Sequence, residues 1–447
     1  MRGLTLAALT LTAAGFWAAA PAAKAPAPAP ATTPTFSKDV APILYKNCTH
    51  CHRDGEIAPM SLLSYDDARP YAKAIVEEIE GGSMPPWHAD PKVGHFKNDR
   101  RLSDTDRSTL LAWAKNGAPK GNPKDLPPLP KYVEGWQIGE PDAVLQMPVE
   151  YKVPDKGQIE YEYFELPTNF TEDKWVQAIE VRAGNRAVVH HVIVYTRAPQ
   201  TERRPAGIRF AEGMDIPRPD PAAPPVKGVS LYPRPQRVGA MIGGFAPGTS
   251  AMQYEPGSAI LVRAGSTIVL QMHYTANGES AVDRTRVGMR FAKQPPEREL
   301  RYGTLVNGAF TIPAGADNHE VTAEMTTTAD ITVRQMLPHT HLRGKSWAYT
   351  ATYPDGRTEP ILSVPKYDFN WQTDYVFAEP LKLPKGTTIR AVAHYDNSTA
   401  NRANPNPKAA VRWGDQTWEE MMFTSFVYSI DGAAPGAVIT AGRGGQQ

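Results

Sequence analysis

Val188-Val189-His190-His191-Val192-Ile193-Val194 is an apolar, β-branched run interrupted by two adjacent histidines. Such residues favour a strand, and burying either imidazole there without a partner costs free energy. A shared metal ion is one way to satisfy both rings, and hydrogen bonds to backbone and carboxylate groups are the other. On a regular strand the two side chains point to opposite faces. A shared ion therefore requires a β-bulge at this point or ligation through different ring nitrogens.

Similar short runs alternate with turn signals through most of the chain after about residue 130. We place strands at residues 161–166, 188–195, 266–274, 331–337, 347–353, 388–394 and 424–430. Regular short strands of this kind predict antiparallel sandwiches. Because the region is too long for one sandwich, we divide it within the proline-rich stretch near residue 296. The prediction is two antiparallel β-sandwich domains, at residues 137–295 and 296–431.

Residues 35–122, ahead of the β region, have helical character instead. Apolar residues follow a helical spacing over 68–79, and Ser103 is placed to cap a last helix that runs to Trp113. A proline-rich linker at 123–136 then leads into the β region. The predicted fold is therefore multidomain, with a small all-α domain followed by the two sandwiches.

The two ends of the chain are predicted to lie outside these domains. Residues 1–25 have the pattern of an export signal, with a cleavage site at Ala23-Lys24-Ala25. An uncleaved anchor is the alternative, but several threonines dilute the apolar run. Residues 26–34 form an Ala/Pro linker, and residues 432–447 a flexible tail. We predict a periplasmic or secreted protein with no stable membrane span after cleavage, and the formal net charge of +1 gives no reason to expect a nucleic-acid partner.

The sequence CTHCH at residues 48–52 contains both cysteines of the chain. Two thiols at this spacing can add to the vinyl groups of haem while the adjacent His52 ligates iron. A zinc or thioredoxin-like site is the alternative, but it would need further thiols or a reducing compartment. Cys48, Cys51 and His52 are thus predicted to attach haem c, in a small cytochrome c domain over residues 35–122.

The sixth ligand of the haem iron is predicted to be Met84. This methionine follows the middle helix in a proline-stiffened loop, which is where small cytochromes usually place an axial thioether. Met60 and His88 remain alternatives. A haem closed by His and Met transfers electrons and does not bind oxygen.

Further histidines lie in or beside the predicted strands. His339 and His341 are two residues apart, so on a strand they share one face within reach of one ion. His273 is alone on its strand and can complete a site only through tertiary proximity. His394 is either a contact of the second metal site or of the substrate, or a structural histidine, and His319 receives no role.

Four motifs in a fixed order resemble the ascorbate-dependent type II copper monooxygenases. They are HHV at 190–192, LQMHY at 270–274, HTHLRGK at 339–345 and Glu419-Glu420-Met421, within a match that spans roughly residues 137–431. The resemblance implies two copper ions. His190, His191 and His273 would hold the electron-transferring copper. The oxygen-binding copper would be held by His339, His341 and Met421, with Met422 as the alternative to Met421.

Departures from this family concern the core and the substrate. The animal members are rich in disulfides, whereas this chain has no cysteine in the β region. The peptide-processing members carry Arg, Asn and Tyr at the positions of Leu337, Phe423 and Ser425, while Gln271 matches a family residue near the first copper. The resemblance therefore implies a substrate that is less polar than a peptide.

These observations combine into one prediction of function. The chain is expected to be a copper-dependent monooxygenase that hydroxylates a C–H bond of a small, non-peptide substrate with O2, at a centre formed by His339, His341 and Met421. Electrons from a periplasmic donor would enter through the haem. The alternatives are an electron-transfer or copper-handling protein without hydroxylase turnover, and a β-sandwich interaction module that binds no copper.

Overall fold

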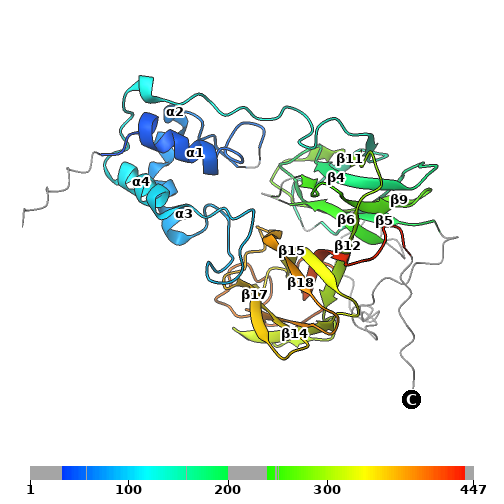
Figure 1. Cartoon of the computed structure of the whole chain (residues 1–447). Coiled ribbons are helices and arrows are strands. Elements are labelled where there is room, and N and C mark those ends of the chain that lie inside the picture. Colours follow the sequence, from blue (N-terminus) through cyan, green and yellow to red (C-terminus); the bar gives the residue numbers. More distant parts are fainter. Residues whose placement is uncertain are drawn as a thin grey trace, which may run out of the picture.

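The structure is a computed structural model that describes residues 33–56, 58–157, 159–199, 239–246, 249 and 251–437. The predicted signal, most of the Ala/Pro linker and the end of the predicted tail lie outside the described residues. Short helices come first, and the regular elements of the rest of the described chain are strands (Figure 1). The predicted mostly-β architecture is thereby confirmed.

The helical part forms a small unit with its own apolar core. Its elements are η1 (Phe36–Val40), α1 (Ala41–Asn47), α2 (Tyr65–Ala68), η2 (Arg69–Tyr71), α3 (Ala72–Gly81), α4 (Asp104–Lys115) and η3 (Pro123–Asp125). The side chain of Ser103 caps α4 by accepting a hydrogen bond from the amide of Asp106 at 3.0 Å, as the sequence predicts. Gly82 ends α3 in the left-handed region, with φ of 73°. Phe36 and Trp113 pack together in the core.

The first β half has two facing sheets. One is the four-stranded sheet β3-β9-β5-β6, and the other is the part β1-β11-β4-β8 of a nine-stranded sheet, with β7 paired to β4. The strands are β1 (Ala143–Gln146), β2 (Tyr151–Val153), β3 (Glu162–Pro167), β4 (Lys174–Arg182), β5 (Val189–Arg197), β6 (Ala240–Phe245), β7 (Met252–Gln253), β8 (Ser258–Val262), β9 (Thr267–Tyr274), β10 (Ala281–Asp283) and β11 (Arg286–Phe291). Their inward-facing apolar residues form one continuous core.

The second β half repeats this plan. The four-stranded sheet β14-β19-β16-β17 faces the remaining part of the nine-stranded sheet, β12-β21-β15-β18. The strands are β12 (Arg298–Val306), β13 (Thr311–Ile312), β14 (His319–Thr326), β15 (Ile331–His339), β16 (Gly344–Thr352), β17 (Thr358–Val364), β18 (Tyr375–Leu383), β19 (Thr388–Tyr395), β20 (Val411–Arg412) and β21 (Phe423–Ile430). Both halves are therefore β-sandwiches.

The two sandwiches share one sheet. Strand β12 pairs in parallel with β8, with Arg298 opposite Ser258 and Leu300 opposite Ile260, and then pairs antiparallel with β21. The predicted division near residue 296 thus falls just before the strand that joins the two halves. Backbone hydrogen bonds cross the junction, so the halves are held together by more than side-chain packing.

The loop between α3 and α4 leaves the helical unit and packs into the second sandwich (Figure 1). Trp87 and Phe96 are both buried in the core of that sandwich, where their rings pack against Tyr375 at 5.1 and 5.5 Å between centroids. Phe96 also forms an isolated bridge with Phe377 of β18. The segment predicted as part of the first domain therefore supplies core residues to the last one.

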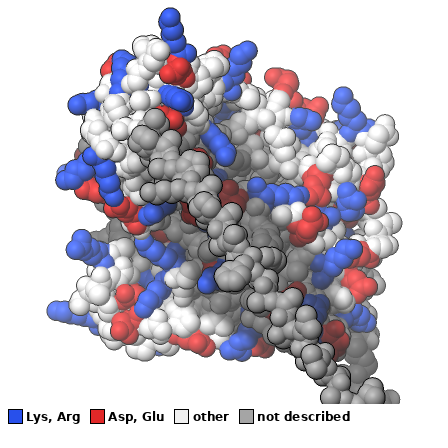
Figure 2. Space-filling model, turned by 60° about the vertical axis from the view of Figure 1, so that its left-hand side comes forward, with Lys and Arg blue, Asp and Glu red and all other residues white. Residues whose placement is uncertain are grey.

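Basic and acidic side chains are interspersed on the molecular face that Figure 2 shows. This pattern agrees with the formal net charge of +1. Within the described part of the chain, no helix has the length and apolar character needed to cross a membrane.

Candidate metal centres

Three histidines of the first sandwich come together where β5 pairs with β9. The register of this pair shifts by one residue between Val189, opposite Tyr274, and His191, opposite His273. His190 is the extra residue at this bulge, so it can turn toward the same side as His191. The bulge that a shared ion requires is therefore present.

The ring nitrogens of the three histidines converge. Nδ1 of His191 lies 3.1 Å from Nδ1 of His190 and 3.3 Å from Nδ1 of His273. All three residues offer a ligand atom within 4.8 Å of one another, and no other such histidine, cysteine or carboxylate group occurs among the described residues. Their spacing suits a single metal ion.

Burial keeps these imidazoles neutral. It lowers the pKa of His190 to about 4 and holds the pKa values of His191 and His273 well below the usual range. The mutual repulsion of the histidines lowers the pKa of His191 further. A neutral imidazole has a lone pair to donate, which is the form that binds a metal.

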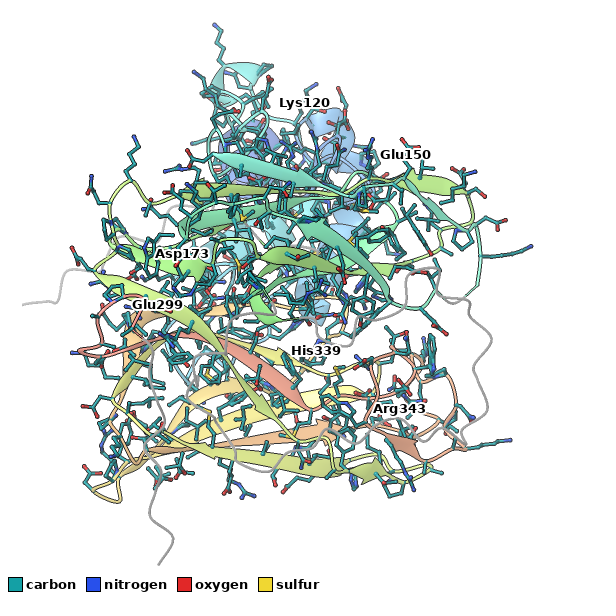
Figure 3. The ribbon with its side chains drawn as sticks, turned by 90° about the vertical axis from the view of Figure 1, so that its right-hand side faces the viewer. Lys120, Glu150, Asp173, Glu299, His339 and Arg343 are labelled. Carbon is teal, nitrogen blue, oxygen red and sulfur yellow. The ribbon has the colours of Figure 1, made fainter. Side chains whose placement is uncertain are left out.

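The second group of predicted ligands lies where β15 meets β21. His339 ends β15 and stands opposite Phe423, and His341 lies beyond the strand end, where its amide and its Nδ1 contact Glu420 and Glu419, just before Met421. Figure 3 shows His339 between the two β halves. His339 and His341 are 7% and 0% exposed, and their ring centroids are 5.1 Å apart.

The two adjacent methionines differ in surroundings. Met421 lines the same cavity as His339, whereas Met422 is fully buried in the core of the second sandwich. The thioether available to a metal beside the histidine pair is therefore that of Met421.

Each histidine of this pair has one ring nitrogen occupied. Nδ1 of His339 lies 2.9 Å from Oε1 of Gln372, and Nδ1 of His341 lies 3.3 Å from the carbonyl oxygen of Glu419. Nε2 of His341 is buried and has no hydrogen-bond partner among the described residues. An outer contact at Nδ1 with a free Nε2 is the arrangement that metal-binding histidines usually have. Burial lowers the pKa of His339 to about 4 and that of His341 well below its usual range.

Glu420 connects the parts of this second group. Its buried carboxylate accepts hydrogen bonds from the backbone amides of His341 at 2.8 Å, Met421 at 3.1 Å and Arg343 at 2.7 Å. Burial raises the pKa of Glu420 to about 7. The side chain thereby fixes the end of β15 against the segment that leads into β21.

Phe369 lies between the two histidine groups. Its ring stacks on His190 at 5.4 Å between centroids, and packs edge-on against His341 at 6.0 Å. No pattern in the sequence points to this residue or to Gln372, because both lie in a loop without regular spacing.

A cavity of about 370 Å³ opens between the two β-sandwiches. His191 of the first group and His339 and Met421 of the second group line it. The structure therefore places members of both predicted ligand sets on one cavity of a size typical of small-molecule sites.

The CTHCH motif follows α1. Backbone amides of Cys51 and His52 donate to the carbonyl of Cys48 at 3.1 and 2.9 Å, which keeps the motif in a tight turn. Burial raises the pKa of Cys48 to about 12 and also raises that of Cys51. A redox-active CxxC pair needs a lowered thiol pKa, so this environment disfavours a thioredoxin-like site.

His52 and the candidate sixth ligands are partly buried. Nδ1 of His52 is buried, and no hydrogen bond to it meets the distance and angle limits among the described residues. Burial lowers the pKa of this imidazole, and the nearby backbone of Met60 raises it by a smaller amount. Met84 follows α3, with its amide 3.2 Å from the carbonyl of Glu78. His88 lies near Asp368 and Lys366 of the second sandwich.

Charged residues link the CTHCH turn to both sandwiches. Glu56 forms ion pairs with Arg53, at 2.8 Å, and with Arg186, which precedes β5. Arg100 interacts electrostatically with Cys51 and with the buried Asp374, whose pKa burial raises to about 7. Because Asp374 also lines the cavity, the helical unit is in electrostatic contact with its wall.

The remaining histidines of the β region have structural contacts. Nε2 of His394 lies 3.6 Å from Glu320, and its Nδ1 lies 3.4 Å from Oγ of Ser346. His319 begins β14 opposite Tyr395. Neither belongs to the two groups described above.

Comparison with known proteins identifies no family. No protein-family model matches the chain, and no curated protein matches it. Among solved structures, it is similar to that of infectious bursal disease virus Gx strain, with 10% identity, a TM-score of 0.19 and coverage of 67% of this chain and 75% of that chain. T=1 particles derived from infectious bursal virus give 11% identity, a TM-score of 0.18 and coverages of 67% and 72%.

A Paenibacillus xanthan lyase gives 10% identity and a TM-score of 0.15, with coverage of 65% of this chain and 25% of that chain. Scores this low carry no argument about fold or function.

Proposed function

We propose that this chain is a periplasmic or secreted copper-dependent monooxygenase, similar to the type II copper monooxygenases, that hydroxylates a C–H bond of a small non-peptide molecule with O2. Electrons would come from a periplasmic donor through a haem c attached to Cys48 and Cys51, with His52 and Met84 as axial ligands. The observation that carries the proposal is that both predicted ligand sets contribute residues to one cavity.

The first set suits copper by donor type and placement. His190, His191 and His273 offer three neutral imidazole nitrogens within 4.8 Å of one another, at a bulge that orients the adjacent pair. Imidazole is a good ligand for copper in either common oxidation state. We assign this set to the electron-transferring copper.

The second set fits copper as well. Nε2 of His341 is an orphaned buried nitrogen, and Met421 adds a soft thioether on the same cavity as His339. Two imidazoles and a thioether favour Cu(I). Copper bound there would supply one of the two electrons that C–H hydroxylation with O2 needs, and the copper assigned to the first set would supply the other.

The chain's own residues prepare this centre. Gln372 holds His339 through Nδ1, and Glu420 holds the backbone of His341 and Met421. The cavity wall is mainly apolar, so it limits the access of water to the reacting C–H bond. Preorganised ligands and a dry wall are what such a reaction requires from a protein.

The haem assignment rests on the motif and its surroundings. Backbone hydrogen bonds from Cys51 and His52 to the carbonyl of Cys48 keep the two thiols and the imidazole together on one tight turn, as covalent attachment of haem requires. Contacts of Glu56 with Arg186 and of Arg100 with Asp374 hold this motif against the sandwiches that carry the two histidine groups.

The test measures metal content and oxygen uptake on the full chain. We expect two coppers per haem, and oxygen consumption by the copper-loaded, haem-reduced protein. His341→Ala should abolish oxygen uptake while haem reduction by dithionite continues, and His394→Ala, at a histidine outside both groups, should retain uptake. Copper binding without reductant-dependent uptake would replace the proposal with an electron-transfer or copper-handling role. A protein that binds no copper would leave only an interaction module.

A further inference from the structure

The wall of the central cavity is largely apolar and aromatic. The apolar lining residues are Tyr161, Val192, Ile193, Tyr195, Met241, Phe245, Ala246, Met252, Tyr302, Val306, Leu337, Trp413, Met421 and Phe423. Such a surface binds a mainly hydrophobic molecule, and any polar group on the wall then selects among such molecules. Two polar groups on this wall have no protein partner.

The first is the amide nitrogen of Gln372. The residue is 6% exposed, and its Nε2 has no hydrogen-bond partner among the described residues. Oε1 is turned toward His339 and lies 2.9 Å from its Nδ1, which is a hydrogen bond to the tautomer that carries its proton on Nδ1. Turning the amide over would set its NH2 group against the N–H of the imidazole. Gln372 therefore presents a donor, and no acceptor, beside His339.

The second is the hydroxyl group of Tyr161. The residue is 4% exposed, and its oxygen also lacks a partner among the described residues. Its ring packs edge-on against His191 at 5.5 Å and against His273 at 5.1 Å, which holds the side chain in place.

Leaving a buried donor without a partner is costly, because the donor has given up its hydrogen bond to water. A ligand that carries hydrogen-bond acceptors would therefore satisfy both donors when it binds in this apolar cavity. We propose that the cavity binds a neutral, mostly apolar small molecule through oxygen acceptors, such as a carbonyl, that take hydrogen bonds from Gln372 and Tyr161. The inference rests on the proposed function only in taking this cavity as the substrate site.

Charge on the wall disfavours an anionic ligand. Among the described lining residues are two carboxylic acids, Asp374 and Asp415, and no lysine or arginine. An anion would lose its hydration without gaining a cationic partner. A primary ammonium group could pair with one of these acids, but it would leave the donors of Gln372 and Tyr161 without an acceptor.

The experiment uses four probes that share a phenyl ring. Acetophenone carries a neutral acceptor, ethylbenzene has none, benzoate is an anion and benzylamine is a cation. Their binding to the full-length, metal-loaded protein is measured by isothermal titration calorimetry without oxygen, so that no turnover is needed. Acetophenone should bind about 25-fold to 100-fold more tightly than ethylbenzene, since each of its two hydrogen bonds contributes about fivefold to tenfold. Benzoate and benzylamine should bind more weakly than acetophenone.

Two variants locate the donors. Tyr161→Phe should weaken acetophenone binding by about fivefold to tenfold and leave ethylbenzene binding unchanged. Gln372→Glu keeps an oxygen for the contact with Nδ1 of His339 and removes the donor, so it should weaken acetophenone binding by at least as much. Tyr302→Phe is the matched control, because Tyr302 lines the same cavity but its hydroxyl already lies 3.2 Å from Sδ of Met252. This control should not change the preference for acetophenone over ethylbenzene.

Equal affinity for acetophenone and ethylbenzene would mean that the two donors serve water, and would overturn the proposal. Stronger binding of benzoate or benzylamine, or no binding of any probe, would overturn it too. A preference for acetophenone that falls in Tyr161→Phe would support the proposal even if the protein consumed no oxygen. Failure of the proposed monooxygenase function therefore remains separate from failure of this inference.

Discussion

The carboxylate of Glu420 accepts a hydrogen bond from the backbone amide of His341, with 2.8 Å between oxygen and nitrogen. The same carboxylate accepts from the amide of Met421 at 3.1 Å. One buried side chain thus sets the spacing of an imidazole and a thioether that are far apart in the sequence. We therefore predict that Glu420 raises the copper affinity of this site, although its own side chain does not bind the metal.

Replacing Glu420 by Gln should test this role. An amide keeps one acceptor oxygen but turns an NH2 group toward a backbone N–H, so we expect a loss of about 1–3 kcal/mol in the free energy of unfolding. Affinity for the copper at His339, His341 and Met421 should fall at least about tenfold, as for other outer contacts of metal ligands. Urea unfolding and a copper titration measure both effects. Glu419→Gln is the neighbouring control, and equal effects of the two substitutions would contradict the role of Glu420.

The bulge at His190 leads to a prediction about stoichiometry. Because His190 can face the same ion as His191 and His273, His190→Ala should reduce the copper content from two ions to one per chain, as measured by mass spectrometry of metals after dialysis. The second site does not use this residue and should keep its copper. His394→Ala should retain both ions, and retention of both by His190→Ala would show that the first site does not need His190 as a ligand.

The metal-free protein should lose stability in mild acid. Burial depresses the pKa values of His190 and His339 to about 4, and those of His191, His273 and His341 well below their usual range. In the unfolded chain these groups take up protons near pH 6.5.

The folded chain takes up these protons only at lower pH, so their contribution to stability is present above about pH 6.5 and is lost as pH falls toward about 4. We expect a loss on the order of 1–3 kcal/mol for each histidine, seen in urea unfolding at a series of pH values. A chain with His339 and His191 both replaced by Gln should show a shallower dependence. An unchanged slope would contradict the assignment of the loss to these histidines.

Phe96 should matter for the stability of a sandwich that begins some 200 residues after it. Its ring is 9% exposed and packs against Tyr375 and Phe377. Phe96→Ala should cost about 3–5 kcal/mol, as other large core truncations do. Leu129→Ala, at a side chain that is 61% exposed, is the control and should cost little. A small effect of Phe96→Ala would show that the loop between α3 and α4 only rests on the sandwich.

Much of the β architecture follows from local pattern. Alternating β-branched runs predict the strands around Val192 and Ile331, and Ser103 predicts the start of α4, because these signals are carried by neighbouring residues. The problem of two adjacent histidines on one strand is also visible in the sequence. Its solution, a one-residue shift between β5 and β9, depends on a partner strand about 80 residues away, so no local pattern contains it.

The contacts around the candidate ligands are harder to predict. Gln372 and Phe369 act through tertiary proximity, and nothing in their spacing distinguishes them from ordinary loop residues. One signal in the sequence could have predicted that Trp87 and Phe96 are buried in the second sandwich. They are two large aromatic residues in an otherwise polar loop between helices. Aromatic side chains of that size are rarely left in solvent, and burial in a distant core is one of their usual fates.

The shared sheet has a consequence for how this protein can be divided. Cutting the chain before β12 would separate Arg298–Leu300 from Ser258–Ile260 and leave each piece with an uncovered row of amide and carbonyl groups. Exposed edges of this kind recruit other chains and promote aggregation. The smallest unit that could be transferred by gene fusion is therefore the pair of sandwiches. One sandwich alone would carry an exposed strand edge into the fusion protein.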